Sequence, residues 1–249
     1  MNEIEKFELE VKNRVGDNGK DKGLKNISNE FFMDTLRKGY SYNFSWLGRP
    51  IIQYPQDMLA LQEIIWDIKP DMIIETGIAH GGSLIFSASM LTLLEACGEI
   101  EEGRVLGIDI DIREHNKKAI LEHPMSKKIT MFEGSSIDSD MITQVKKFAK
   151  KGKKILVCLD SNHTHEHVLA ELNAYASLVS VGSYCCVFDT IIEDMPENSF
   201  PDRPWDIGDN PKTAVWEYLK TNEEFMIDKS IENKLLITVA PDGFLKRVK

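Results

Sequence analysis

The sequence predicts an α/β protein with a mostly parallel sheet and helices on both of its faces. Short apolar segments alternate with helical segments between about residues 71 and 189, which is typical of repeated β–α–β units. Residues 72–74 are apolar without alternation, as expected for a strand that is covered on both faces. Two further strand-like segments near the C-terminus favour an antiparallel hairpin at the edge of the same sheet.

Composition limits the classes of protein to which the chain can belong. Of its 249 residues, 42% are hydrophobic, which is enough for a sizeable core. The 30 basic and 40 acidic residues give a net charge of −10, which argues against binding to nucleic acid or to an anionic membrane. No apolar run approaches the ~20 residues of a membrane span, and the charged first residues do not resemble a signal peptide. We therefore expect a cytoplasmic protein.

The first part of the chain is weakly patterned. We divide the sequence into a helical or irregular extension, residues 1–45, and a main domain, residues 46–249. Helical spacing of aromatic and aliphatic residues predicts a helix over 28–38. Residues 41–56 are rich in aromatic residues and interrupted by Gly and Pro, which indicates an irregular segment. The aromatic character of this region favours a homo-oligomer.

The elements of the main domain follow in a regular order. Strands are expected at 72–76, 104–109, 128–133, 154–160 and 183–189, and then at 224–229 and 234–240. Helices are expected at 57–66, 83–96, 113–121, 138–150, 164–178 and 212–222. A loop with four prolines, residues 195–211, is a candidate lid. The cysteines in these strands, Cys158, Cys185 and Cys186, are expected to be small core residues rather than disulfide or zinc ligands.

The segment 70–83 is expected to bind a ligand, because it combines a strand, a turn rich in glycine and the start of a helix. Ser83 is placed to cap that helix. The spacing G-x-G-x-x-G of dinucleotide sites is absent. The carboxylate of Glu75 would repel a pyrophosphate but accept hydrogen bonds from an ammonium or hydroxyl group, so it suits S-adenosylmethionine (SAM) better than NAD. An NAD-dependent oxidoreductase is therefore disfavoured, and a plain turn with a solvated Glu stays open.

The first, second, fourth and fifth of the expected strands carry an acid at or next to their ends: Glu75, Asp109, Asp160 and Asp189. Such ends converge on one crevice of an open α/β sheet. Carboxylates in a cluster repel one another unless a positive group lies among them. The pattern thus predicts a binding crevice rather than four independent surface acids.

The ends of the second and third expected strands are candidates for binding a nucleoside. Asp109 ends the second strand, where a carboxylate holds ribose hydroxyls in nucleotide-type folds, and Asp111 is the second candidate for this role. Ser135 and Ser136 follow the third strand, where an adenine edge would rest. The alternatives are a helix N-terminal acid for Asp109 and a simple turn with a helix cap for the serines.

The last two strand-end acids suggest a metal site and a base. Asp160 and Asp189 suit a hard cation such as Mg²⁺, which prefers oxygen ligands. His163 follows Asp160 by three residues, where a neutral imidazole can take a proton from a substrate hydroxyl. His165 and His167 are expected to face solvent along the next helix.

Taken together, these residues resemble the cephalosporin hydroxylase family, a branch of the SAM-dependent O-methyltransferases that includes rhamnosyl and macrolide sugar O-methyltransferases. The resemblance runs from about residue 41 to the C-terminus. The matching stretches are WLGRPI (46–51), EIIW (63–66), PDMIIETGIAHGGS (70–83), GIDIDIR (107–113), LDSNHT (159–164) and DGFLKR (242–247).

The resemblance implies a Rossmann-like class I methyltransferase fold with seven strands, and Mg²⁺ that assists the deprotonation of a sugar hydroxyl. It also implies that SAM is bound by the Glu75 turn and Asp109. With the positions argued from the strand ends, the predicted SAM contacts are Glu75, Thr76, Gly77, His80, Gly81, Ser83, Asp109, Asp111, Ser135, Ser136 and Asp160. Macrolide sugar enzymes use a histidine three residues after the first metal aspartate as base, which corresponds to His163 here.

One position departs from the family pattern. The second metal motif is usually a Glu-Asp pair at the end of the fifth strand, and here the pair is Phe188-Asp189. Water, Glu193 or Asp194 can fill the place of the missing ligand, or the site holds no metal. The sequence predicts an O-methyltransferase acting on a sugar, glycan or similar small-molecule hydroxyl. A SAM-binding partner protein that has lost catalysis and supports another enzyme is the alternative.

Overall fold

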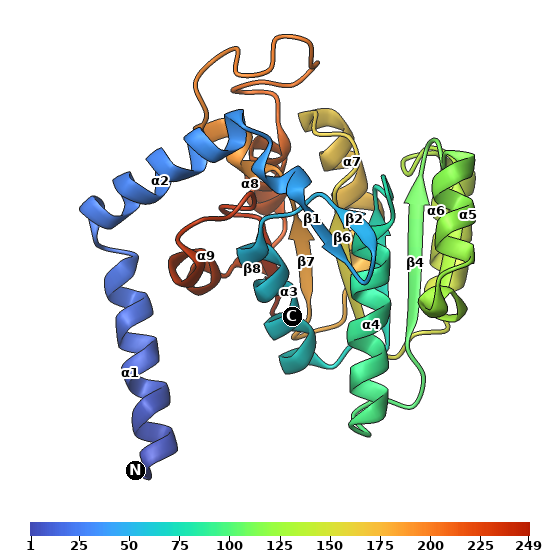
Figure 1. Cartoon of the computed structure of the whole chain (residues 1–249), viewed down its shortest axis with the longest axis horizontal. Helices are drawn as coiled ribbons and strands as arrows, with labels where there is room; N and C mark the ends of the chain where they lie inside the picture. The colour runs from blue at the N-terminus through green and yellow to red at the C-terminus, as the bar shows by residue number, and fades with distance from the viewer.

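The computed structural model describes all 249 residues, and its centre is a seven-stranded sheet in the order β5-β4-β3-β6-β7-β9-β8 (Figure 1). Its strands are β3 (Met72–Thr76), β4 (Arg104–Asp109), β5 (Ile129–Glu133), β6 (Ile155–Leu159), β7 (Tyr184–Val187), β8 (Phe225–Ile227) and β9 (Phe244–Arg247). The first five pair in parallel, whereas β9 pairs antiparallel with both β7 and β8. The expected α/β class, with a mostly parallel sheet and antiparallel C-terminal strands, is confirmed.

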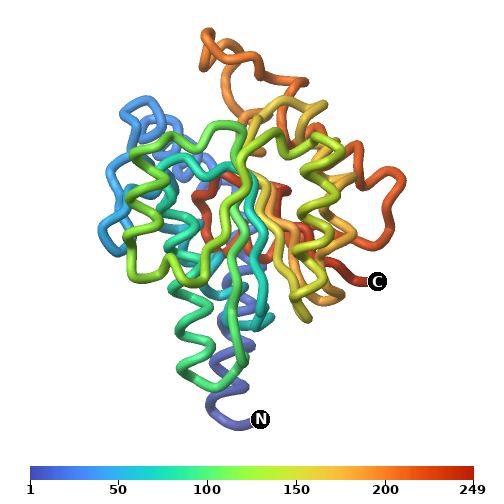
Figure 2. The backbone as a smooth tube through the Cα atoms, turned by 90° about the vertical axis from the view of Figure 1, so that its right-hand side faces the viewer, coloured from blue at the N-terminus to red at the C-terminus, as the bar shows by residue number.

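Helices cover both faces of the sheet, as Figure 2 shows with the sheet seen from its edge. The helices are α3 (Pro55–Ile68), α4 (Gly82–Ala96), α5 (Glu114–Leu121), α6 (Ser139–Ala149), α7 (His165–Tyr175), α8 (Pro211–Thr221) and α9 (Lys229–Leu235). Residues of α3, α4 and α5 join one apolar core, and residues of α6, α7 and α8 join the other. Strand β3 contributes Ile73 to the first core and Ile74 to the second, because successive strand residues point to opposite faces. This burial explains why β3 lacks apolar alternation.

The expected strand at 234–240 is wrong. Residues 229–235 form α9, whose N-terminus is capped by the Asp228 carboxylate, and the chain enters the sheet only at Phe244. The apolar residues before that point are held outside the sheet by Asp57 of α3, which is fully buried. Its carboxylate accepts hydrogen bonds from the Thr238 hydroxyl and, at 3.0 Å, from the Val239 N–H. A contact distant in sequence therefore overrides the local strand preference.

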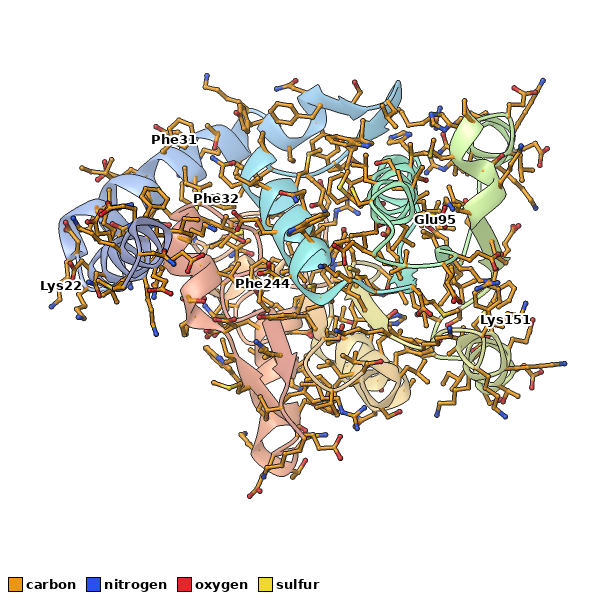
Figure 3. All side chains as sticks on the ribbon, turned by 90° about the horizontal axis from the view of Figure 1, so that it is seen from below. Lys22, Phe31, Phe32, Glu95, Lys151 and Phe244 are labelled. Carbon is orange, nitrogen blue, oxygen red and sulfur yellow. The ribbon has the colours of Figure 1, made fainter.

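The N-terminal extension contains more regular structure than expected. It forms α1 (Glu3–Asn18) and α2 (Lys22–Arg37), and α1 projects from the body of the molecule beside α9 (Figure 1). Phe32 points from α2 toward the body and stacks on Tyr54 at 5.0 Å, whereas Phe31 lies on the outer side (Figure 3). The segment after α2, expected to be irregular, contains the short hairpin β1 (Phe44–Trp46) and β2 (Arg49–Ile51).

Two expectations drawn from composition can be compared with the structure. None of the helices combines the length and the apolar character that crossing a bilayer requires. Cys158, Cys185 and Cys186 are buried free thiols on β6 and β7, as predicted, and Cys97 is exposed at the end of α4. Cys185 and Cys186 lie in different cores, as strand alternation requires.

Candidate active site

The turn after β3 is closely bound to the neighbouring strands. Gly77 has a φ of 88°, and a Cβ atom at this position would lie only 1.9 Å from the carbonyl oxygen of Asp160. Only glycine allows this approach, because it lacks the side chain that would collide and it adopts positive φ readily. The amide of Gly77 also donates to the carbonyl of Ile108 at 2.8 Å. The loops after β3, β4 and β6 therefore meet at one point.

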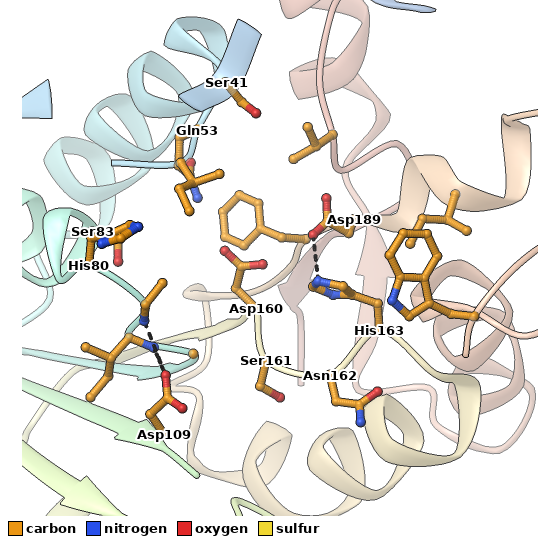
Figure 4. A pocket seen from close by; sticks show the side chains of 18 of the residues that line it. Ser41, Gln53, His80, Ser83, Asp109, Asp160, Ser161, Asn162, His163 and Asp189 are labelled. Atoms are coloured by element: carbon orange, nitrogen blue, oxygen red, sulfur yellow. Dashed lines mark hydrogen bonds and ion pairs between the residues drawn. The ribbon is translucent and has the colours of Figure 1, made fainter. Parts of the chain in front are cut away.

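Asp109 fixes the same turn from β4. One carboxylate oxygen accepts hydrogen bonds from the backbone amides of Ile78 at 2.8 Å and Ala79 at 3.2 Å, and the other accepts from Asp111 at 3.1 Å (Figure 4). A carboxylate has about four lone-pair sites, three of which these amides use, so one on Oδ1 is left for a ligand. Asp109 is therefore a structural clamp of the turn and also a half-buried acceptor at the cavity wall.

Glu75 lies deeper than Asp109 and is almost completely buried. Its carboxylate accepts a hydrogen bond from the hydroxyl of Ser83, and burial raises the pKa of Glu75 to about 7. The predicted capping role of Ser83 is wrong, because α4 begins one residue earlier, after Gly81 in the left-handed conformation, and no side chain caps it. Ser83 instead faces back across the turn toward the strand-end acid.

The carboxyl ends of the strands open into a cavity of about 600 Å³, a size typical of small-molecule sites. Most of the predicted site residues line it: Gly77, His80, Ser83, Asp109, Ser135, Ser136, Asp160, His163 and Asp189. Four predicted residues lie outside this lining: Glu75, Thr76, Gly81 and Asp111. Thr76 is buried in the sheet, and the side chain of Asp111 is 71% exposed beside Arg113.

Asp160, His163 and Asp189 form a compact group on the cavity floor (Figure 4). One potential ligand atom from each lies within 4.8 Å of the other two, and Nε2 of His163 is 3.2 Å from Asp189 Oδ2. Burial, together with the carboxylates of Asp189 and Glu75, raises the pKa of Asp160 well above its usual range. This repulsion makes the floor favourable for a cation. Phe188, which replaces the glutamate of the family pattern, is buried beside Asp189.

The loop over the cavity carries an aromatic wall. Phe200, Arg203 and Trp205 line the cavity, and the Trp205 ring contacts the rings of Phe200 and His163 edge-on at 5.1 and 5.7 Å. The loop is anchored at its ends, for example by Glu193, which accepts a hydrogen bond from the Gly208 amide at 2.8 Å. Between residues 196 and 207 its other hydrogen bonds are internal.

The expected exposure of the two later histidines is wrong. His165 Nδ1 lies 2.8 Å from the hydroxyl of Thr213 on α8, and His167 lines the cavity. Sequence reasoning missed His167 because the helical phase of α7 was unknown. The spacing of four residues between His167 and Glu171 is the signal that indicates a shared helix face.

Comparison with known proteins identifies the family to which this chain belongs. The profile of the family described as rhamnosyl O-methyltransferase/CmcI matches residues 38–248. This chain belongs to that family. A rhamnosyl O-methyltransferase of Mycobacterium tuberculosis is 30% identical over 221 residues, which cover 86% of this chain and 84% of the relative. One of Mycobacterium leprae is 28% identical, with 86% and 90% covered.

Family membership confirms the expected resemblance and the assignment to SAM-dependent O-methyltransferases. The fold agrees with a solved structure of CmcI described as its Mg–SAM form, with a TM-score of 0.57 at 18% identity, covering 84% of this chain and 78% of that one. The cavity at the strand ends is therefore the candidate active site of this chain.

Proposed function

We propose that this chain transfers the methyl group of SAM to a hydroxyl group of a sugar or of a similar polyhydroxyl small molecule or glycan. The observation that supports it most directly is the Asp160–His163–Asp189 group on the floor of the cavity, in a chain of the rhamnosyl O-methyltransferase/CmcI family. Methyl transfer is an in-line displacement, so the protein has to align the two substrates and make the hydroxyl nucleophilic.

The cofactor binds, in this proposal, between the turn after β3 and the end of β4. Asp109 offers the lone pair left on Oδ1 to a ribose hydroxyl, and Gly77 and His80 line the adjacent wall. Ser83, which lines the cavity, faces the methionine portion, and Glu75 lies behind it and accepts its hydroxyl proton. SAM supplies the methyl group as a sulfonium carbon.

His163 acts as the base that accepts the proton of the acceptor hydroxyl. Asp189 lies 3.2 Å from its Nε2 and stabilises the positive charge that develops on the ring. The edge-on contact of Trp205 with His163 restricts the orientation of the His163 ring. Phe200 and Trp205 provide flat apolar surfaces for the acceptor ring.

The donor set also suits a divalent cation. Asp160 and Asp189 would hold Mg²⁺ through carboxylate oxygens, with water completing its coordination. The raised pKa of Asp160 supports this assignment, because a cation relieves the repulsion between the carboxylates. The ion would lower the pKa of a bound hydroxyl. Phe188 supplies no oxygen, so the protein contributes fewer carboxylate ligands than the family pattern.

The proposal is tested by incubating the enzyme with SAM and a panel of rhamnosides and other glycosides, with detection of methylated product by mass spectrometry. His163→Ala should lower kcat by about 100-fold or more while SAM affinity is unchanged. The exposed His115 on α5 provides the matched control, His115→Ala. Normal turnover of His163→Ala would refute the role of the base.

The substitution at Phe188 favours one alternative function, a SAM-binding partner protein without catalysis. Tight SAM binding with no methylated product across the panel, together with a co-purifying enzyme, would support it.

Four further expectations stay predictions: a cytoplasmic location, no binding to nucleic acid, a homo-oligomeric state and a boundary between residues 1–45 and 46–249. Fractionation, electrophoretic mobility with DNA and RNA, light scattering and limited proteolysis test them.

A further inference from the structure

The loop over the cavity carries one positive side chain that the proposed methyl transfer does not use. In Figure 1 this loop, residues 195–211, is the orange arch above the carboxyl ends of the parallel strands. Arg203 is its only basic residue, and it is also the only arginine or lysine among the residues that line the cavity. The cavity therefore offers a single permanent positive charge to a ligand.

The guanidinium group of Arg203 has no partner in the chain. The backbone N–H of this residue donates to the carbonyl of Phe200 at 3.0 Å, but its side chain forms neither an ion pair nor a hydrogen bond with another residue. An arginine side chain presents five N–H donors in a planar fork. All five are free for a ligand.

The acids of the loop and of its anchors are committed to other groups or lie away from the cavity. Glu193 accepts a hydrogen bond from the Gly208 amide at 2.8 Å, and Asp194 pairs with Lys212 at 2.5 Å. Asp206 accepts hydrogen bonds from two backbone amides, both at 2.9 Å. The remaining acids of the loop are exposed and lie outside the cavity lining: Glu197, Asp202 and Asp209. No carboxylate of the loop therefore neutralises Arg203.

Aromatic contacts connect Arg203 to the candidate base. The Trp205 ring contacts the His163 ring at 5.7 Å and the Phe200 ring at 5.1 Å, and the backbone of Phe200 is bonded to that of Arg203. Aromatic faces provide apolar surface on which a sugar ring can pack. A sugar ring on this wall, with one hydroxyl at His163, therefore extends toward the guanidinium group.

The floor of the cavity and the loop favour groups of different charge. Asp160 and Asp189 repel an anion, so the part of the acceptor that reacts at the floor should be neutral, as a hydroxyl group is. An acceptor bound under the loop also displaces water from Arg203, and a cation that loses water without gaining a partner costs free energy. A carboxylate or a phosphate group on the acceptor would supply this partner, because two of its oxygens match the planar fork.

We propose that the acceptor is an acidic sugar, which presents a neutral hydroxyl to His163 and a carboxylate or phosphate group to Arg203. This inference rests on the proposed methyl transfer to a sugar hydroxyl and narrows its substrate class. Arg203 is a specificity-determining residue, because it selects the acidic acceptor without taking part in the chemistry. The two oxyanions share this mode of recognition, and the experiment separates them.

The test is a competition between acidic and neutral acceptors in one reaction. The enzyme is given SAM and an equimolar mixture of methyl glucoside, methyl glucuronide and methyl glucoside 6-phosphate, together with the corresponding galactose and mannose compounds. Mass spectrometry measures the methylated products. At low conversion the ratio of acidic to neutral product equals the ratio of their kcat/KM values, so it does not depend on how much of a variant is folded.

Three variants accompany the wild-type chain. Arg203→Gln removes the charge, and Arg203→Lys keeps the charge but not the planar fork. Arg14→Gln removes the same charge from α1, outside the cavity lining, and is the matched control.

In the wild-type chain the uronic acids or the phosphates should give about tenfold more product than the neutral glycosides, and the preferred set identifies the oxyanion. Arg203→Gln should lower this ratio to about twofold or less and Arg203→Lys to about threefold, while Arg14→Gln retains it. Neutral products in equal or greater amount in the wild-type reaction would overturn the inference and leave the proposed function standing. An unchanged ratio in Arg203→Gln would overturn it as well. No methylated product from any acceptor, the larger panel of glycosides included, would remove the proposed function and this inference with it.

Discussion

Replacement of Asp109 by Asn should weaken SAM binding strongly, whereas the same replacement at Asp111 should not. The Asp109 carboxylate accepts hydrogen bonds from three backbone N–H groups, at 2.8, 3.2 and 3.1 Å, and lines the cavity with one lone pair left on Oδ1. Asn keeps one oxygen for the amides of Ile78 and Ala79. Its NH₂ group cannot accept from the Asp111 amide or from a ribose hydroxyl.

The expected magnitude follows from the bonds that are lost. Hydrogen bonds to a charged group contribute about 1.5–3 kcal/mol, and 1.4 kcal/mol corresponds to a factor of ten in affinity. The dissociation constant for SAM should therefore rise by about 10- to 100-fold in Asp109→Asn. Asp111 carries the same charge, but its side chain is 71% exposed and lies outside the cavity lining. Asp111→Asn should change the constant by about twofold or less.

Calorimetric titration of both variants with SAM, at one ionic strength, makes the comparison. Thermal unfolding of each variant controls for loss of the fold, since Asp109 also clamps the turn after β3. Equal losses in the two variants would mean that net charge matters rather than direct contact. Unchanged affinity in a folded Asp109→Asn variant would refute the assignment of the ribose site.

Three further predictions concern the turn, a buried acid and the lid. Gly77→Ala should lower the free energy of unfolding by about 3 kcal/mol or more, or unfold the site, because the new Cβ would lie 1.9 Å from the carbonyl oxygen of Asp160. Gly98 also has a positive φ but has open space around it, so Gly98→Ala should lower the free energy of unfolding by only about 1 kcal/mol. Chemical denaturation of both variants measures the difference. Burial raises the pKa of Asp57 from 3.8 to about 7, so the folded state holds this proton where the unfolded state has lost it. As the pH rises from about 4 to about 7, the free energy of unfolding should therefore fall, by at most about 4 kcal/mol from this group. The fall should be smaller in Asp57→Asn. An identical dependence on pH in the two proteins would contradict this prediction. Trp205→Ala should raise KM for the acceptor about three- to tenfold without changing the affinity for SAM. Trp66 lies on the outer side of α3, so Trp66→Ala should change neither quantity. A change in SAM affinity alone in Trp205→Ala would count against a lid role for the loop.

Much of the fold follows from local patterns in the sequence. The unalternated strand at 72–76 and the acids at strand ends predict a buried parallel sheet with one crevice, and Asp109, Asp160 and Asp189 do line one cavity. This succeeds because residues at the carboxyl ends of parallel strands have little freedom in where they lie. The position of His163 beside Asp189 follows from the same geometry.

The errors arise where distant contacts decide the structure. Residues 234–240 have the composition of a strand, but Asp57, which is 181 residues away from Thr238, holds them outside the sheet. Serine is a residue type that often caps helices, but the hydroxyl of Ser83 donates a hydrogen bond to Glu75 instead. The helix starts after Gly81 without a side-chain cap. No single-sequence pattern contains these pairings.

The contact of Gly77 with the backbone of Asp160 has a consequence for redesign of the enzyme. Because no side-chain atom fits between the two loops, we expect a displacement of the turn after β3 to displace the floor of the cavity as well. Directed changes of acceptor are therefore best confined to residues 196–207, whose hydrogen bonds are internal to the loop and its anchors. Grafting this loop from a relative would exchange the aromatic wall of the cavity, which we propose to contact the acceptor, and leave the rest of the cavity in place.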